Sequence, residues 1–99
     1  MATTTTTPTI ATATSTTILA ANLRRKSLRI QNASAANIMI SLEGATLTGI
    51  APTATNIGVV VPNGTTVTLA AGDICPTGIL KAYQTSGGDI NTVVVVEGS

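Results

Sequence analysis

Residues 27–42 read S-L-R-I-Q-N-A-S-A-A-N-I-M-I-S-L, and this stretch carries the clearest structural signal in the chain. Apolar Leu28 and Ile30 alternate with polar side chains, and a similar alternation returns in residues 38–42. An apolar period of two residues is typical of a strand with one buried face. The intervening residues 32–37, N-A-S-A-A-N, are typical of a turn. The stretch therefore predicts a β-hairpin with one face buried.

The rest of the chain repeats this pattern in shorter pieces. Turn residues such as Pro62-Asn63-Gly64 interrupt the apolar stretches, and no segment has a 3.6-residue apolar period of useful length. About six or seven short strands of this kind, with turn signals at regular spacing, predict an all-β fold. We expect a single antiparallel β-sandwich, jelly-roll-like, or a small barrel. After the opening stretch, the predicted strands lie at residues 59–61, 65–71, 79–85 and 92–97.

Composition favours a small protein that works inside an assembly. The 99 residues support one core, and they include no Phe or Trp and a single aromatic side chain, Tyr83. Val, Ile and Leu must therefore build the core, and small domains of this kind often gain stability from oligomerisation. Charged residues make up 9% of the chain, against roughly 25% in ordinary soluble proteins. The run Val93–Val96 is apolar on both faces, so a loop, the N-terminal segment or a neighbouring subunit should cover its second face.

The N-terminal segment differs from the rest in composition. Residues 1–21 are rich in Thr and Ala and carry no charged side chain. Thr favours extended structure, and Pro8 excludes a continuous helix. We therefore predict an extended arm at residues 1–21, followed by a sandwich domain at residues 22–99. Residues 1–7 should be flexible in the free protein, and residues 9–20 should pair with a sheet edge or a neighbouring subunit.

Groups for catalysis are scarce. The chain has no His, so the usual general base near neutral pH is missing. Cys75 is the single cysteine, which excludes an internal disulfide and a Cys–His pair, and we predict a buried thiol there. No His or Cys pair can hold zinc. We interpret the scattered carboxylates as solvated groups near turns or strand ends: Glu43, Asp73, Asp89 and Glu97. The sequence thus predicts a protein that is not an enzyme and needs no cofactor or metal.

Four of the five basic residues gather at the start of the first clear strand, in Arg24-Arg25-Lys26 and Arg29. Extending the alternation backwards places Arg25 and Arg29 on the outward face, where they could meet an acidic partner or a phosphate backbone, or remain solvated. Single-strand binders add stacking aromatics and groove readers add a helix, and the region has neither, so we expect no nucleic acid. The predicted partner interface combines arm anchors and basic residues: Thr9, Ile10, Ile18, Leu19, Arg24, Arg25 and Arg29.

Several stretches together resemble a known class of protein. The segments N-L-R-R-K-S-L-R-I-Q-N-A-S (22–34), N-I-M-I-S-L (37–42), C-P-T-G-I-L-K-A-Y (75–83) and V-V-V-V-E-G (93–98) are similar to small structural proteins of tailed bacteriophages. The similarity covers about residues 22–98. It implies a β-sandwich virion protein, such as a capsid decoration (cement) protein or a head or tail accessory protein. It also implies a homo-oligomer, often a trimer at local three-fold positions, with N-terminal arms that reach over neighbours.

Three functions follow from these expectations. The first is a decoration protein that binds the major capsid protein outside the head and stabilises capsomer junctions. The second is a tail, neck or fibre-base subunit that contacts another virion protein. Both place the protein in the virion after synthesis in the host cytoplasm, and we expect no membrane contact because no apolar run is long enough to span a bilayer. The third is a carbohydrate-binding module, for which Tyr83 would be the single aromatic platform.

Overall fold

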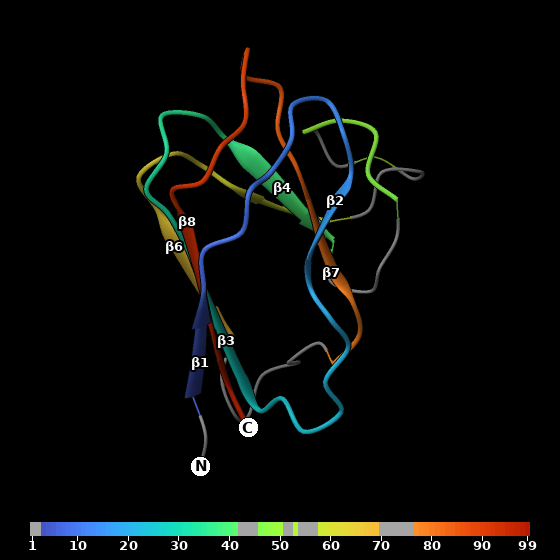
Figure 1. Cartoon of the computed structure of the whole chain (residues 1–99), viewed down its shortest axis with the longest axis vertical. Helices are drawn as coiled ribbons and strands as arrows, with labels where there is room; N and C mark the ends of the chain where they lie inside the picture. Colours follow the sequence, from blue (N-terminus) through green and yellow to red (C-terminus); the bar gives the residue numbers. More distant parts are fainter. Residues whose placement is uncertain (1–2, 42–45, 51–52, 54–57, 70–76) are drawn as a thin grey trace.

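The computed structural model describes residues 3–41, 46–50, 53, 58–69 and 77–99. These residues form eight strands and no helix (Figure 1). All of the strand pairs are antiparallel. The all-β expectation is therefore confirmed. The strands are β1 (Thr3–Thr6), β2 (Thr16–Leu19), β3 (Ser27–Asn32), β4 (Ile38–Ser41), β5 (Val59–Val61), β6 (Thr66–Leu69), β7 (Leu80–Tyr83) and β8 (Val93–Gly98).

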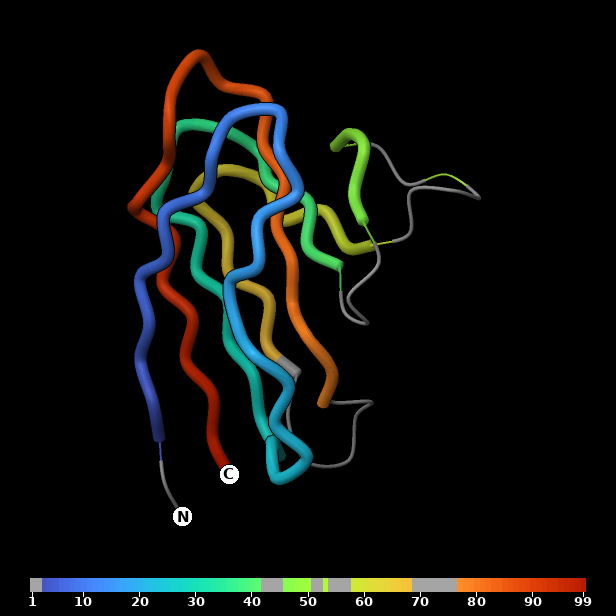
Figure 2. The backbone as a smooth tube through the Cα atoms, turned by 45° about the vertical axis from the view of Figure 1, so that its right-hand side comes forward, coloured from blue at the N-terminus to red at the C-terminus, as the bar shows by residue number. Residues whose placement is uncertain are grey.

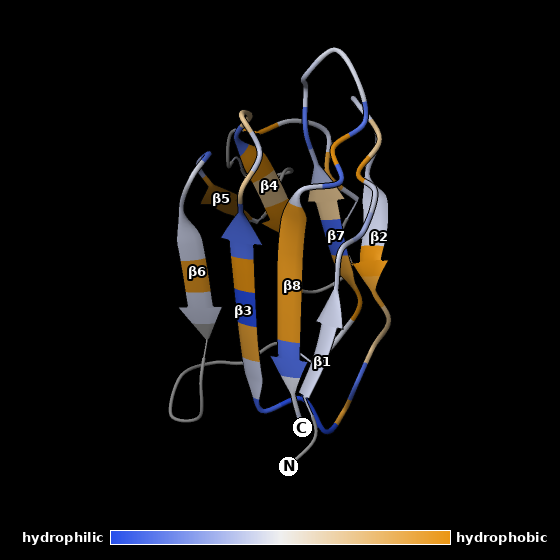
Figure 3. Ribbon diagram, turned by 60° about the vertical axis from the view of Figure 1, so that its left-hand side comes forward, coloured by the Kyte–Doolittle hydropathy of each residue, from blue (hydrophilic) through white to orange (hydrophobic). Residues whose placement is uncertain are grey.

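The strands form two four-stranded sheets that face each other (Figure 3). The order is β1-β8-β3-β6 in sheet 1 and β2-β7-β4-β5 in sheet 2. Every connection except β4–β5 passes from one sheet to the other. Eight antiparallel strands in two such sheets make a jelly roll. The strand count exceeds the expected six or seven because the N-terminal segment supplies β1 and β2.

The predicted hairpin of residues 27–42 is wrong in its pairing. β3 lies between β8 and β6 in sheet 1, whereas β4 lies between β7 and β5 in sheet 2. Both strands have the buried apolar face that the alternation predicts. These faces meet across the core rather than side by side in one sheet. Residues 33–37 consequently form an arch between the two sheets.

A single aliphatic core fills the space between the sheets. In β8, Val93 and Val95 face this core and are fully buried, whereas Val94 and Val96 are half-buried on the outer face of sheet 1. β8 is a central strand, and Thr5 and Arg29 flank Val96 in register from the two neighbouring strands. Side chains of the neighbouring strands in sheet 1 therefore cover part of the outer face of β8. The core cluster consists of Ile10, Ile18, Leu19, Leu28, Ile30, Ile38, Ile40, Val61, Leu80, Ala82, Ile90, Val93 and Val95.

The outer side of sheet 2 carries an additional covering segment. Residues 46–50 lie on this side of the sandwich (Figure 2). Leu47 in this segment and Met39 of β4 are both buried, although neither belongs to the main core cluster. The Leu47 amide donates a hydrogen bond to Ser15 Oγ (3.1 Å). Close packing continues at Gly58, where a Cβ atom would lie 2.5 Å from the Ile40 carbonyl oxygen.

The two halves of the jelly roll are equivalent in topology. If four is added to each strand number of sheet 1, and the count returns to one after eight, the order β1-β8-β3-β6 becomes β5-β4-β7-β2. This is the order of sheet 2 in reverse. The arch between β3 and β4 then corresponds to the arch between β7 and β8. Both arches lie at the end opposite to the chain termini (Figure 1). This correspondence extends to side chains, because each arch begins with a buried amide side chain.

Asn32 holds the first arch and is fully buried. Its Nδ2 donates to the carbonyl oxygens of Ala36 (2.8 Å) and Val61 (2.9 Å). Its Oδ1 accepts hydrogen bonds from the Ser34 amide (3.1 Å) and from Ser34 Oγ (2.5 Å). The side chain thus uses both ends of its amide to fix the chain reversal and to tie it to the end of β5.

Gln84 holds the second arch in the same way and is also fully buried. Its Nε2 donates to the carbonyl oxygens of Gly88 (2.8 Å) and Ile10 (3.1 Å). Its Oε1 accepts hydrogen bonds from the Ser86 amide (2.6 Å) and from Ser86 Oγ (2.6 Å). We call these two arrangements the amide clips. The spacings N-x-S-x-A and Q-x-S-x-G are their signature in the sequence.

Gly64 and Ala13 also occupy equivalent positions in the two halves, and they provide a stability prediction. The Gly64 amide donates to the Asn32 carbonyl oxygen, and the Ala13 amide donates to that of Gln84, both at 2.8 Å. Both donors have left-handed backbone angles, with φ of 75° at Gly64 and 50° at Ala13. This conformation costs an L-residue roughly 1–2 kcal/mol more than glycine. Ala13→Gly should therefore raise the free energy of unfolding by about 1 kcal/mol, and Gly64→Ala should lower it by about 1 kcal/mol.

Urea unfolding of the wild type, Ala13→Gly and Gly64→Ala measures both changes in the free energy of unfolding. Gly87→Ala serves as the control, because Gly87 lies outside the left-handed region and a Cβ there meets nothing within 4 Å. The control should not lose stability as Gly64→Ala does. A loss of stability in Ala13→Gly would contradict the assignment of strain to this residue.

Candidate partner interface

The seven predicted interface residues do not form one surface. Ile10 exchanges backbone hydrogen bonds with Ile90 (2.7 and 3.0 Å), and its side chain lies in the protein's own core. β1 pairs with β8, and β2 pairs with β7. Residues 1–21 therefore supply one strand to each sheet of the sandwich. The buried members of the set are Ile10, Ile18, Leu19 and Arg25, and the exposed members are Thr9, Arg24 and Arg29.

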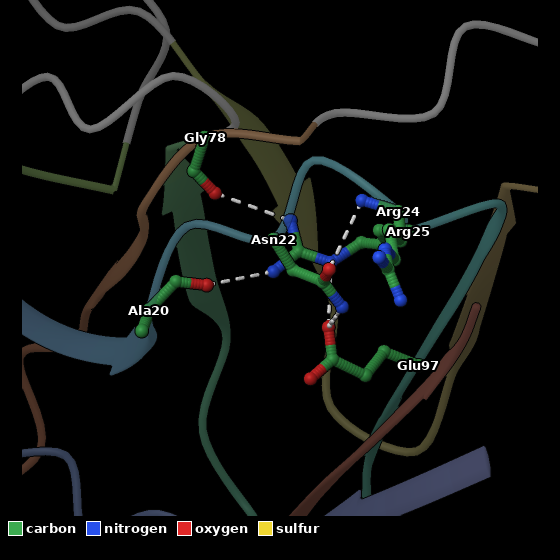
Figure 4. Close-up of polar contacts among 6 residues, drawn as sticks. All are labelled: Ala20, Asn22, Arg24, Arg25, Gly78 and Glu97. Carbon is green, nitrogen blue, oxygen red and sulfur yellow. Dashed lines mark hydrogen bonds and ion pairs between the residues drawn. The ribbon is translucent and has the colours of Figure 1, made fainter. Parts of the chain in front are cut away.

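Arg25 points inwards, so its predicted outward placement is wrong. Its side chain has no exposed surface, and its Nε donates to Glu97 Oε2 (2.8 Å) in a buried ion pair. Its Nη1 donates to the Gly78 carbonyl oxygen (3.1 Å), and its Nη2 donates to that of Ala20 (2.9 Å) (Figure 4). We call this arrangement the arginine clip. It ties the end of β2 to the start of β7 and to the last strand.

The alternation fails at Arg25 because the chain turns before β3 begins. The Arg24 amide donates to Asn22 Oδ1 (3.0 Å), and the Arg25 amide donates to the Asn22 carbonyl oxygen (3.1 Å). These bonds close a turn at residues 22–25. Alternation of faces holds only within an extended strand, and it therefore cannot be continued backwards through this turn.

Glu97 is a site residue that the sequence reasoning missed. The sequence predicts a solvated group here, but the Glu97 side chain is mostly buried and accepts hydrogen bonds from Arg25 and from Asn22 Nδ2 (3.4 Å). A signal was present in the sequence. Glu97 follows Val93 and Val95 at a spacing of two, so it shares their inward face. A carboxylate on a core face requires a charged or hydrogen-bonding partner.

The turn held by the arginine clip presents an exposed apolar and basic surface. Leu23 is 88% exposed, and Ile79 is 41% exposed. Arg24 and Lys26 are exposed on either side of the clip. The Asn22 amide donates to the Thr77 carbonyl oxygen (2.8 Å), which joins the two segments that carry the apolar side chains. We call this surface the tip and define it by Leu23, Arg24, Lys26 and Ile79.

Arg29 belongs to a different surface, the outer face of sheet 1. It lies opposite Val96 on one neighbouring strand and Thr68 on the other. Gln31 follows on the same face and is also exposed. This face is polar apart from the half-buried Val94 and Val96. It offers hydroxyl and amide groups together with a single charge, and its described members contain no carboxylate.

The described parts of the chain contain no group of three possible metal ligands. They also contain no helix that could cross a membrane. Glu43, Asp73 and Cys75 lie outside the residues that the structure describes, so their predicted roles stay predictions. Asp89 is exposed, as expected for a solvated turn residue.

No family model, curated protein or solved structure matches this chain. The function must therefore be argued from the fold and from the surfaces that the chain exposes.

Proposed function

We propose that this protein is a structural virion protein, a capsid decoration (cement) protein that binds the outside of a bacteriophage head. The observation that carries the proposal is the tip, where the large apolar side chains Leu23 and Ile79 are exposed together with basic Arg24 and Lys26. Such a surface is suited to contact with another protein. Jelly rolls occur in viral capsids, and also in lectin domains, so the fold by itself does not assign the function. The sequence resemblance to phage structural proteins is the reason for proposing a bacteriophage particle.

Stabilisation of the head would follow from surface buried across junctions between capsomers. A standard protein interface takes about 800 Å² from each partner. The chain has 5247 Å² of accessible surface, so contacts with two or three neighbours would still leave more than half of it exposed. A protein that binds the assembled shell more tightly than its separated subunits shifts the equilibrium towards the shell. A homotrimer at a local three-fold position would place three copies of the tip on the shell at once.

The test uses purified protein and phage heads assembled without it. We expect the protein to co-sediment with the heads in a ratio set by the number of capsomers, and to raise the temperature at which they release DNA. Imaging of the particles then locates the bound copies. Absence of binding to heads, with no change in the release temperature, would contradict the proposal.

The alternative within the virion is a tail, neck or fibre-base subunit, which the same imaging would reveal as a few copies at one vertex or on the tail. A carbohydrate-binding module has weaker support, because Tyr83 is half-buried and lies opposite Met39 in register. Binding in a glycan array without binding to particles would favour that function.

A further inference from the structure

We infer that the tip is the main contact with the partner, and that Leu23 enters an apolar pocket rimmed by carboxylates on the head surface. This inference rests on the proposed function and names the chemistry of the surface that the protein binds. It is carried by three observations on the tip, namely its rigidity, its exposed apolar side chains and its charge.

The first observation is that the tip is held in place before any partner binds. The Arg24 and Arg25 amides donate hydrogen bonds to Asn22 within the turn, and the Arg25 guanidinium donates to Glu97, Gly78 and Ala20, so the chain is fixed on either side of Leu23. A buried ion pair of this kind contributes little to stability compared with a well-packed apolar pair. What it provides here is a defined position for an exposed turn. A side chain displayed on a rigid turn loses less conformational entropy when it binds, which favours affinity.

The second observation is that the apolar exposure is concentrated. Leu23 and Ile79 are the two large apolar side chains exposed in the described part of the chain. They lie on segments that hydrogen bonds join directly. Isolated exposed apolar residues are common on protein surfaces. Two of them lie on adjoining segments of one end, whereas the other large apolar side chains whose burial the structure describes are buried or half-buried, and this indicates an anchor for a pocket.

The third observation is the sign of the charge around the anchor. Arg24 and Lys26 are exposed, whereas Glu97 is engaged by Arg25 and Asn22. The exposed Asp89 lies in the loop at the opposite end of the sandwich (Figure 1). Among the described side chains of the tip, the exposed charged ones are therefore basic. An acidic rim on the partner complements it, and such complementarity speeds association and selects the orientation of docking.

The experiment measures binding of variants to heads assembled without this protein. Leu23→Ser should lower the affinity by about 10-fold or more, as expected for a central apolar anchor. Arg24→Glu combined with Lys26→Glu should slow association, with the largest effect at low salt. Because all three side chains are exposed, the melting temperatures of these variants should stay close to that of the wild type.

Arg29→Glu is the matched control, since it reverses an exposed charge on the outer face of sheet 1. It should change the affinity by no more than about 2-fold if the tip is the contact. If the wild type binds heads and Leu23→Ser binds equally well, the inference falls while the proposed function stands. An equal loss of affinity in Arg29→Glu and in the Arg24→Glu, Lys26→Glu double variant would also overturn the inference. The attraction to the head would then depend on the overall charge of the protein and not on the tip. If the wild type binds anionic phospholipid vesicles but no heads, the inference and the proposed function both fall.

Discussion

Replacing Arg25 with Met should lower the free energy of unfolding by about 3–5 kcal/mol, as expected when one partner of a buried ion pair is removed. The substitution would leave the Glu97 carboxylate mostly buried without its cation. It would also remove the donors that now satisfy the carbonyl oxygens of Ala20 and Gly78. A domain of this size has about 5–15 kcal/mol of stability in total. The loss would therefore leave a large part of the population unfolded at moderate denaturant concentrations.

Arg24→Met is the matched control, because it removes the same charge one residue earlier from an exposed side chain. Urea unfolding should show a change within about 0.5 kcal/mol for this control. A double variant, Arg25→Met with Glu97→Leu, should regain part of the lost stability, since it removes the carboxylate that the single variant leaves unpaired. If Arg25→Met and Arg24→Met unfold at the same urea concentration, the arginine clip does not stabilise the protein in solution.

The second large effect concerns the amide clips at the opposite end. Asn32→Ala and Gln84→Ala should each lower the free energy of unfolding by about 2–6 kcal/mol, because each removes four hydrogen bonds worth about 0.5–1.5 kcal/mol apiece. Each also leaves carbonyl groups at a buried position without their donor. The two losses should be similar, since the two clips have the same bonds at equivalent positions of the fold.

Gln31→Ala provides the control for this pair of variants. It removes an amide from the same strand as Asn32, but from the exposed face, and should change stability by less than about 0.5 kcal/mol. Thermal and urea unfolding of the four proteins would test the prediction. Loss of stability in one clip variant with none in the other would contradict the equivalence of the two halves.

The clips at both ends compensate for a limited core. The chain has no Phe or Trp, and the core cluster consists of Ile, Leu, Val and Ala side chains. An aliphatic core of this kind stabilises many arrangements of short strands almost equally, because burial of apolar surface is not directional. Hydrogen bonds from Asn32, Gln84 and Arg25 are directional, and each one fixes a connection between the sheets. We therefore expect the clips to define the topology as well as to add stability.

The strand positions from residue 27 onwards could be predicted from the sequence. Alternation placed β3 and β4, and apolar runs bounded by turn residues placed β5, β6, β7 and β8, each within a few residues of its observed bounds. The outward position of Arg29 was also correct. These successes share one cause, which is that the period of side chains along a strand is a local property of the backbone.

The candidate site was harder to predict. The arm anchors Ile10, Ile18 and Leu19 were assigned to a partner, but they pack in the core of the same chain. A Thr-rich strand has few apolar side chains. Its sequence therefore does not show whether it pairs within its own domain or with a sheet of a neighbouring subunit. Leu23 was overlooked as well, because one Leu beside a basic run carries no signal of exposure in the sequence.

The sequence by itself determined that this protein is all-β, where most strands lie and which of their side chains face inwards. It also determined that no His is present for catalysis. Only the tertiary structure decided that β3 and β4 belong to different sheets, that the N-terminal segment completes both sheets, and that Arg25 is buried while Leu23 is exposed. The physical reason is that backbone hydrogen-bonding edges are alike in every strand. Pairing and burial therefore depend on how all of the strands pack together, which no local pattern specifies.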